Sequence, residues 1–214
     1  QEGLGRHKGY EYARTHNLTR RSLERNLAAL EGGTDAYCFA SGLAATQAVL
    51  TFVEAGQRVV VSDNVYGGTH RLFTKILAHY GVEFVFIDTS DPRELATRAG
   101  RFDLLWIETP TNPMLKLCDI RAVADAVSDR EVIVVADNTF ATPINQNPLA
   151  LGADIVIHSA TKYLDGQGRC VGGAVLGVVG GIGIHRFPDF YTRMHAASTT
   201  DTLCAALFLL GLGL

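Results

Sequence analysis

The sequence lacks several features that would mark whole classes of protein. Across its 214 residues, no apolar run reaches the roughly 20 residues that a transmembrane helix needs. The first residues, Gln1 to Arg6, do not contain the continuous apolar segment of a secretory signal. The formal net charge is only −3, which does not favour nucleic acid or an anionic membrane as a partner. We therefore predict a cytoplasmic globular protein whose 47% hydrophobic content supplies one substantial core.

Cysteine is scarce, and the motifs of several common sites are missing. The four cysteines are far apart, form no CxxC pair and do not cluster with histidine: Cys38, Cys118, Cys170 and Cys204. This spacing argues against a metal site and a disulfide framework. The glycine-rich stretch from Gly177 to Ile184 lacks the GxGxxG spacing of dinucleotide-binding proteins, so we interpret it as a flexible turn. A nucleotide-binding α/β protein would also need a phosphate loop at its first strand–helix turn, and none is present there.

Short apolar segments alternate with helical ones along the chain. Strands are expected at residues 37–40, 59–62, 84–87, 104–107, 132–136 and 155–158, and helices at 19–31, from 69 to about 80, at 119–128 and at 203–214. Strands separated by helices pair in parallel with right-handed crossovers. The pattern therefore predicts one α/β domain, a mostly parallel sheet flanked by helices. In residues 19–31, Leu23, Leu27 and Leu30 are expected to form the buried face, and Gly32-Gly33 to end the helix.

The most informative residues are an acid and an amine that follow two of the expected strands. Asp137 closes the run 132–136, and Lys162 follows the run 155–158 within Ser159-Ala160-Thr161-Lys162. Parallel strands bring both residues to one edge of the sheet. There the amine can form an imine with pyridoxal 5′-phosphate (PLP), the acid can hold the pyridine nitrogen protonated, and the hydroxyls of Ser159 and Thr161 can bind phosphate oxygens. Singly, the residues also fit a surface lysine and a turn-capping aspartate; together they favour PLP.

Three further turns follow expected strands and have both a structural and a functional interpretation. Ser41-Gly42-Leu43 fits an ordinary capped helix, or a helix start whose free amides bind a phosphate. Tyr66 fits a half-buried turn tyrosine, or a ring that stacks on a flat cofactor. Glu108 and Asn112 lie in a turn made rigid by two prolines, and they could orient the cofactor ring or its oxygen substituent. His158, before the lysine turn, is expected to be packed.

Six segments, in order, resemble one known family. They are Gly9-Tyr10-Glu11-Tyr12-Ala13-Arg14, Ala40-Ser41-Gly42-Leu43-Ala44-Ala45, Val65-Tyr66-Gly67-Gly68-Thr69, Glu108-Thr109-Pro110-Thr111-Asn112-Pro113, Asp137-Asn138-Thr139-Phe140 and His158-Ser159-Ala160-Thr161-Lys162-Tyr163. The chain resembles the Cys/Met-metabolism PLP enzymes, the group of cystathionine γ-lyase, cystathionine γ-synthase and homoserine-ester sulfhydrylase. The resemblance runs from about Gly9 to Gly177, with a weaker similarity from Asp201 to Leu214.

The resemblance implies a fold and a division of the chain. The fold would be the large domain of the type I PLP-dependent transferases, the fold of aspartate aminotransferase. Residues 1–18 would form an N-terminal arm that contributes to the neighbouring subunit's site. Residues 19–200 would be the PLP-binding domain, and 201–214 the start of a truncated C-terminal segment. A homodimer, or a homotetramer built as a dimer of dimers, is implied.

The resemblance also implies a role for each candidate residue. Lys162 would be the Schiff-base lysine and later a proton shuttle, Asp137 would pair with the pyridine nitrogen, and Tyr66 would stack on the ring and act in catalysis. The phosphate would be held by Gly42, Leu43, Ser159 and Thr161, and by Tyr12 and Arg14 from the neighbouring subunit. No metal is implied.

The implied reaction is γ-elimination on a sulfur amino acid such as cystathionine. Two alternatives stay open: γ-replacement, as in cystathionine γ-synthase or O-succinylhomoserine sulfhydrylase, and a truncated, non-catalytic PLP-binding remnant. Gly166 to Cys170 resembles the sulfhydrylase loop, whereas Met114 to Leu117 resembles bacterial γ-lyases. The family's Asn-Pro-Thr is replaced by Asn17-Leu18-Thr19. The chain stops before the family's C-terminal domain, which carries the arginine for the substrate carboxylate, so a fragment or a natural truncation is expected.

Overall fold

A seven-stranded mixed sheet is the centre of the molecule, and its strand order is β1-β7-β6-β5-β4-β2-β3. The computed structural model describes residues 9–10 and 17–177. The strands are β1 (Asp35–Phe39), β2 (Arg58–Ser62), β3 (Glu83–Ile87), β4 (Leu104–Glu108), β5 (Ile133–Asp137), β6 (Ile155–His158) and β7 (Gly173–Gly177). Strands β3, β2, β4, β5 and β6 pair in parallel, and β7 runs antiparallel to both β6 and β1. Six of the seven strands therefore end at the same edge.

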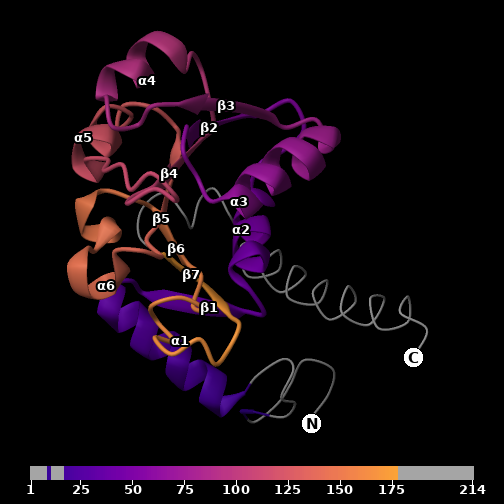
Figure 1. Ribbon diagram of the computed structural model, residues 1–214, viewed down its shortest axis with the longest axis vertical. Coiled ribbons are helices and arrows are strands. Elements are labelled where there is room, and N and C mark those ends of the chain that lie inside the picture. Colours follow the sequence, from indigo (N-terminus) through magenta and orange to yellow (C-terminus); the bar gives the residue numbers. More distant parts are fainter. Residues whose placement is uncertain (1–8, 11–16, 178–214) are drawn as a thin grey trace.

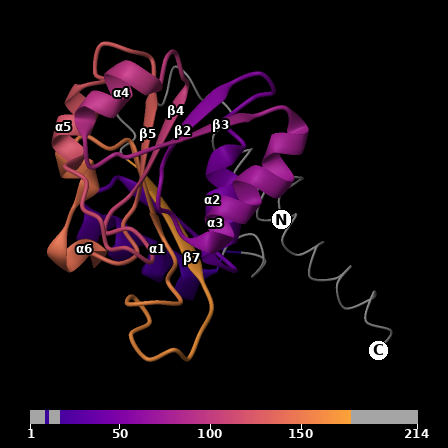
Figure 2. The same ribbon diagram turned by 45° about the horizontal axis from the view of Figure 1, so that its top comes forward.

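Helices cover both faces of the sheet and make a three-layer structure (Figures 1 and 2). On one face lie α2 (Gly42–Leu50) and α3 (Gly67–Arg71), over a core that includes Val49, Phe73 and Trp106. On the other lie α1 (Leu18–Glu31), α4 (Pro92–Arg98), α5 (Ile120–Asp125) and α6 (Thr142–Asn145). The core there includes Leu105 and Val123. Because the sheet is covered on both faces, its parallel strands are continuous apolar runs, and this pattern predicted them from the sequence.

The predicted α/β architecture and all six predicted strands are confirmed to within two residues at each end. The helix predicted to run to about Tyr80 is present but irregular, since α3 continues as a π-helical turn (Leu72–Ile76) and a 3₁₀ turn (Leu77–Tyr80). The seventh strand, β7, was not predicted. Its sequence, Gly-Ala-Val-Leu-Gly, is short and bounded by glycines, and it becomes a strand because β1 and β6 leave a gap that it fills with hydrogen bonds on both sides.

The predicted buried face of α1 is partly wrong. Leu27 is buried, but Leu23 and Leu30 are about half exposed. The helix instead buries Glu24, Leu27, Ala28 and Glu31, a stripe with the i, i+3, i+4, i+7 spacing. Both glutamates have partners inside the protein, so the helix is rotated by about one residue position relative to the leucine pattern. Gly32 ends the helix in the left-handed conformation, as predicted.

Asn17 begins α1 as its N-cap, and its side-chain oxygen accepts hydrogen bonds from the amides of Thr19 (2.9 Å) and Arg20 (3.2 Å). Leu18 occupies the first helical position, which also suits proline. With leucine in place of the family's proline at position 18, α1 still begins at the same Asn17 cap.

The predictions for the two ends of the chain fall outside the described residues. These are most of the arm of residues 1–18, including Tyr12 and Arg14, the helix 203–214, and the glycine-rich stretch after Gly177. Leu18, which we assigned to the arm, is the first residue of α1. Within the described residues, no helix is long and apolar enough to cross a membrane. The same part of the chain holds no cluster of three or more His, Cys, Asp or Glu side chains suited to a metal ion.

Candidate active site

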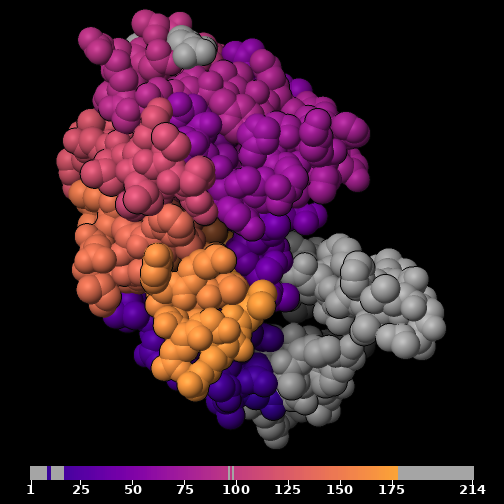
Figure 3. All heavy atoms as spheres, viewed as in Figure 1, coloured from indigo at the N-terminus to yellow at the C-terminus, as the bar shows by residue number. Residues whose placement is uncertain are grey.

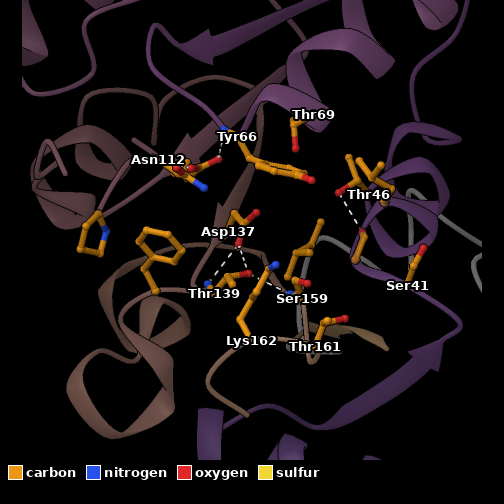
Figure 4. A pocket seen from close by; sticks show the side chains of 16 residues that line it. Ser41, Thr46, Tyr66, Thr69, Asn112, Asp137, Thr139, Ser159, Thr161 and Lys162 are labelled. Atoms are coloured by element: carbon orange, nitrogen blue, oxygen red, sulfur yellow. Dashed lines mark hydrogen bonds between the residues drawn. The ribbon is translucent and has the colours of Figure 1, made fainter. Parts of the chain in front are cut away.

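A cavity of about 220 Å³ opens at the edge of the sheet where the strands end. Figure 4 shows side chains from five strand–helix or strand–loop turns pointing into it. Its lining comprises Ser41, Gly42, Leu43, Thr46, Tyr66, Thr69, Glu108, Pro110, Asn112, Asp137, Thr139, Phe140, Ile157, Ser159, Thr161 and Lys162. A cavity at the carboxyl ends of parallel strands is the usual location of ligand sites in open α/β sheets.

Asp137 and Lys162 both line this cavity, with their side chains near each other (Figure 4). Asp137 ends β5, and Lys162 lies in the turn after β6, the parallel neighbour of β5. Thr139 joins the two strand ends. Its backbone amide and hydroxyl both donate to Asp137 Oδ1, at 3.0 and 2.6 Å, and its hydroxyl oxygen accepts from the amide of Ser159 at 2.8 Å. One carboxylate oxygen is thereby held, and the other is available to a ligand in the cavity.

The start of α2 and the turn after β6 form a cradle suited to an anion. Ser41 caps the helix by accepting from the amide of Ala44 at 3.1 Å. The amides of Gly42 and Leu43, in the first turn, have no carbonyl within the helix to bind. A Cβ on Gly42 would lie 2.8 Å from Ser159 Cβ, so only glycine allows the helix start to approach Ser159 this closely. The cradle combines free amides, a hydroxyl and the positive end of a helix.

Tyr66 lies beside the cavity, before the first turn of α3. Its ring passes close over Gly68, where a Cβ would lie only 2.4 Å from Tyr66 Cε1. The glycine therefore gives the tyrosine ring space to lie beside the cavity. This geometry explains the glycines next to Tyr66 in the sequence.

The carboxylate of Glu108, which lines the cavity, accepts hydrogen bonds from two backbone amides. Oε2 accepts from the amide of Tyr66 at 2.9 Å, and Oε1 accepts from the amide of Asn112 at 2.8 Å. Glu108 thus connects the end of β4 to the tyrosine turn and to the proline-rich turn. The described geometry makes Glu108 a residue that positions Tyr66 and Asn112.

The two carboxylates at the ends of β4 and β5 influence each other. Glu108 is buried and pairs in register with Asp137 on the neighbouring strand. Burial, and then the charge of Asp137, raise the pKa of Glu108 from 4.5 to about 8. Burial also raises the pKa of Asp137, against the opposing hydrogen bonds from Thr139. A cationic ligand group next to Asp137 would favour its ionised form.

Replacing Glu108 should remove much of the pH dependence of stability in the cofactor-free protein. Since the folded pKa of Glu108 is raised, the folded state binds more protons than the unfolded state between pH 4.5 and about 8. The free energy of unfolding should therefore fall as the pH rises through this window, by roughly 2–4 kcal/mol. Urea unfolding should show this fall in wild type and a much smaller one in Glu108→Gln. The exposed Glu54, replaced by Gln, is the control, and an unchanged slope in Glu108→Gln would contradict the assignment.

The cavity brings together nine of the predicted residues: Gly42, Leu43, Tyr66, Glu108, Asn112, Asp137, Ser159, Thr161 and Lys162. The hydroxyl of Thr161 also contacts the backbone of Gly172, accepting from its amide at 3.0 Å and donating to its carbonyl at 3.2 Å. His158 is fully buried, as predicted. Thr46, Thr69 and Thr139 line the cavity but were not predicted. For Thr139, the available signal was its place two residues after Asp137.

Comparison with known proteins decides the family. A family model described as "Cys/Met metabolism PLP-dependent enzyme" matches residues 1–186. The chain belongs to this family. A probable cystathionine gamma-synthase of Herpetosiphon aurantiacus is 48% identical over 179 residues, covering 82% of this chain and 56% of that protein. A cystathionine beta-lyase of Coxiella burnetii is 48% identical over 182 residues, covering 83% of this chain and 46% of that protein.

The solved structures agree with the family and with the fold. Cystathionine gamma-lyase from Lactobacillus plantarum, complexed with L-serine, matches with a TM-score of 0.82 and 37% identity, over 94% of this chain and 51% of that one. The fold is thus that of PLP-dependent cystathionine lyases, as predicted. The chain spans about half the length of the curated relatives it matches.

A second family model, described as "Na+/H+ antiporter subunit", matches residues 170–214. It covers less than a quarter of the chain, too little to show membership of that family. The first model ends at residue 186, so the similarity to PLP enzymes that we predicted for residues 201–214 lies outside it and inside the second match.

PLP is the cofactor of this family, and the cavity fits it. The cradle at Gly42 and Ser159 has the donors and the close approach that a phosphate group needs. An amine, Lys162, a carboxylate, Asp137, and an aromatic ring, Tyr66, line the same cavity (Figure 4).

Proposed function

We propose that the protein uses PLP for γ-elimination on a sulfur amino acid such as cystathionine, with Lys162 as the cofactor-binding lysine. The observation that carries the proposal is the convergence of Lys162, Asp137 and Tyr66 on one cavity beside an anion cradle. PLP supplies the electron sink that stabilises a carbanion at the substrate α-carbon. The residues of the chain supply binding, orientation and proton transfer.

Lys162 has two roles in this proposal. Its amine would hold the cofactor covalently in the absence of substrate. Once free, the same amine would remain within the cavity and take up the α-proton of the substrate. Lys162 lies in the loop between β6 and β7, which Figure 3 shows in orange at the surface of the molecule.

The other site residues hold the cofactor in the orientation that this chemistry needs. Asp137, which accepts a hydrogen bond from Thr139, would pair with the ring nitrogen and keep it protonated. Tyr66 would stack on the ring and act in catalysis, and Glu108 holds both Tyr66 and Asn112 by their amides. The cradle would bind the phosphate through Gly42, Leu43, Ser159 and Thr161.

Three reactions have to be distinguished for this site: γ-elimination, γ-replacement and β-elimination. The similar proteins described above are a probable gamma-synthase, a gamma-lyase and a beta-lyase. β-Elimination breaks the bond to the substituent on the β-carbon, whereas γ-elimination and γ-replacement both break the bond to the substituent on the γ-carbon. The two γ-reactions differ in the next step, which is release of a 2-oxo acid and ammonia or addition of a sulfur nucleophile. The bacterial γ-lyase character of Met114 to Leu117 favours γ-elimination, and the loop from Gly166 to Cys170 keeps γ-replacement as the second candidate.

Product analysis with L-cystathionine tests the proposal. γ-Elimination with water releases cysteine, 2-oxobutanoate and ammonia, whereas β-elimination releases homocysteine, pyruvate and ammonia. γ-Replacement would instead consume a homoserine ester and cysteine and form cystathionine. We expect 2-oxobutanoate as the main 2-oxo acid. Pyruvate alone would replace the proposal by β-elimination. PLP binding without any turnover would favour the non-catalytic remnant.

We also propose a homodimer or homotetramer in the cytoplasm, with Tyr12 and Arg14 completing the phosphate site of the neighbouring subunit. The support is the family membership of the chain. Sedimentation of the purified chain at micromolar concentration tests this, and a monomer under conditions of full PLP binding would contradict it.

A further inference from the structure

A buried polar cluster lies behind the cofactor cavity, on the α1 side of the sheet, and the proposed reaction does not use it. Its centre is the carboxylate of Glu31, the last residue of α1, which is 1% exposed. Oε1 accepts from Asn138 Nδ2 at 2.8 Å and contacts His158 Nε2 at 2.6 Å. A carboxylate interacting with both groups can only accept, so Nε2 of His158 carries the hydrogen.

A third partner, Asn147, donates from Nδ2 to Oε2 of Glu31 at 3.5 Å. The two partners on Oε1, Asn138 and His158, adjoin residues of the cavity. Asn138 follows Asp137, and His158 precedes the turn that carries Ser159 and Lys162. The two strand ends are also joined directly, since the amide of Asn138 donates to the carbonyl of Ile157 at 2.9 Å. The carboxylate of Glu31 therefore contacts the same two strand ends that Thr139 joins, through Asn138 and His158.

The contact between Glu31 and His158 is the main polar restraint on the histidine ring. His158 is fully buried, and its Nδ1 has no hydrogen-bond partner among the described residues. Without Glu31, a buried imidazole would have no polar contact there and could turn or admit water. Burying a carboxylate costs desolvation free energy that its hydrogen bonds must offset, and an apolar side chain would pack without that cost. The presence of a glutamate at this position therefore indicates a role besides packing.

We propose that Glu31 is a positioning residue for the cofactor site, acting through Asn138 and His158 to fix the spacing of Asp137 and the Ser159–Lys162 turn. This inference rests on the proposed function, in which these groups bind PLP from two different strands. If their spacing loosens, the ring nitrogen and the phosphate cannot both be bound in one geometry. The consequence is weaker cofactor binding, although Glu31 itself does not touch the cofactor.

Glu24 provides a matched control. It lies two turns earlier on the same buried stripe of α1, is 7% exposed, and accepts from the amide of Cys38 in β1 at 3.1 Å. It also lies within 3.6 Å of Arg20 and 3.5 Å of Arg21. Glu24 is thus a buried glutamate of similar structural importance that does not contact the strand ends β5 and β6.

The test compares Glu31→Gln with Glu24→Gln in the full chain by two measurements. Fluorescence titration with PLP should show affinity about tenfold weaker for Glu31→Gln, the loss of about 1.4 kcal/mol, and unchanged for Glu24→Gln. The visible band of the bound cofactor should shift or weaken only in Glu31→Gln. If Glu31→Gln does not fold, Glu31→Asp, which keeps the charge but shortens its reach, replaces it in both measurements.

Amide hydrogen exchange without PLP is the second measurement. Glu31→Gln should accelerate exchange at Thr139, whose amide donates to Asp137, and at Ser159, whose amide donates to Thr139 and joins the two strand ends. Glu24→Gln should instead accelerate exchange at Cys38. Unchanged exchange at Thr139 and Ser159, or equal PLP affinity in the two variants, would overturn the positioning role. If wild type bound no PLP, the proposed function would fail, and the exchange result would still decide whether Glu31 fixes the strand ends.

Discussion

Lys162→Ala should abolish turnover and the visible absorption band that wild type acquires with PLP, while the protein stays folded. The side chain of Lys162 is exposed in the cavity, so its removal leaves no gap in the core. The thermal midpoint should therefore change by no more than a few degrees. Loss of proton transfer alone should lower the turnover rate by about 100–10,000-fold, and loss of covalent cofactor binding should lower it further.

Absorption spectra of wild type and Lys162→Ala with PLP, recorded beside the cystathionine assay, measure this effect. Lys75→Ala is the control, because Lys75 is an exposed lysine that does not line the cavity. Borohydride reduction followed by peptide mass spectrometry should place the cofactor on Lys162 in wild type. A band of wild-type intensity in Lys162→Ala, or the label on another lysine, would refute the assignment.

Asp137→Asn should bind PLP more weakly and lower turnover by about 100–1,000-fold, the range typical of losing one preorganised electrostatic contact. Asparagine keeps the shape of the side chain and can still accept from Thr139, but it has no negative charge to hold the ring nitrogen protonated. The electron sink would then be weakened although the cofactor is still bound to Lys162.

Steady-state kinetics and PLP titration of Asp137→Asn separate these two effects. Thr139→Val is the matched variant, since it removes the hydroxyl that orients Asp137 without removing the charge. We expect it to lower turnover by about tenfold, in line with the loss of one charge-assisted hydrogen bond. Turnover of Asp137→Asn within twofold of wild type would show that the carboxylate does not act on the ring.

The sequence alone determined where the strands end and which polar residues follow them. In a sheet covered on both faces, each parallel strand is a continuous apolar run, and the first polar residue marks its end. Asp137 at the end of β5 and the lysine turn after β6 could therefore be placed at one edge of the sheet from the sequence. The same reasoning located Tyr66, Glu108 and the helix start at Gly42.

Only the tertiary structure decided how those residues are supported. The leucine pattern of α1 predicted the wrong buried face, because the partners of Glu24 and Glu31 lie in distant strands and give no local signal. Glu108 holds two backbone amides from turns 42 and 4 residues away, which spacing alone cannot indicate. Strand β7 needs two neighbours to complete its hydrogen bonds, and both are assembled from separate parts of the chain. Local apolar pattern therefore specified the site's position, and long-range hydrogen bonds between buried polar groups specified its geometry.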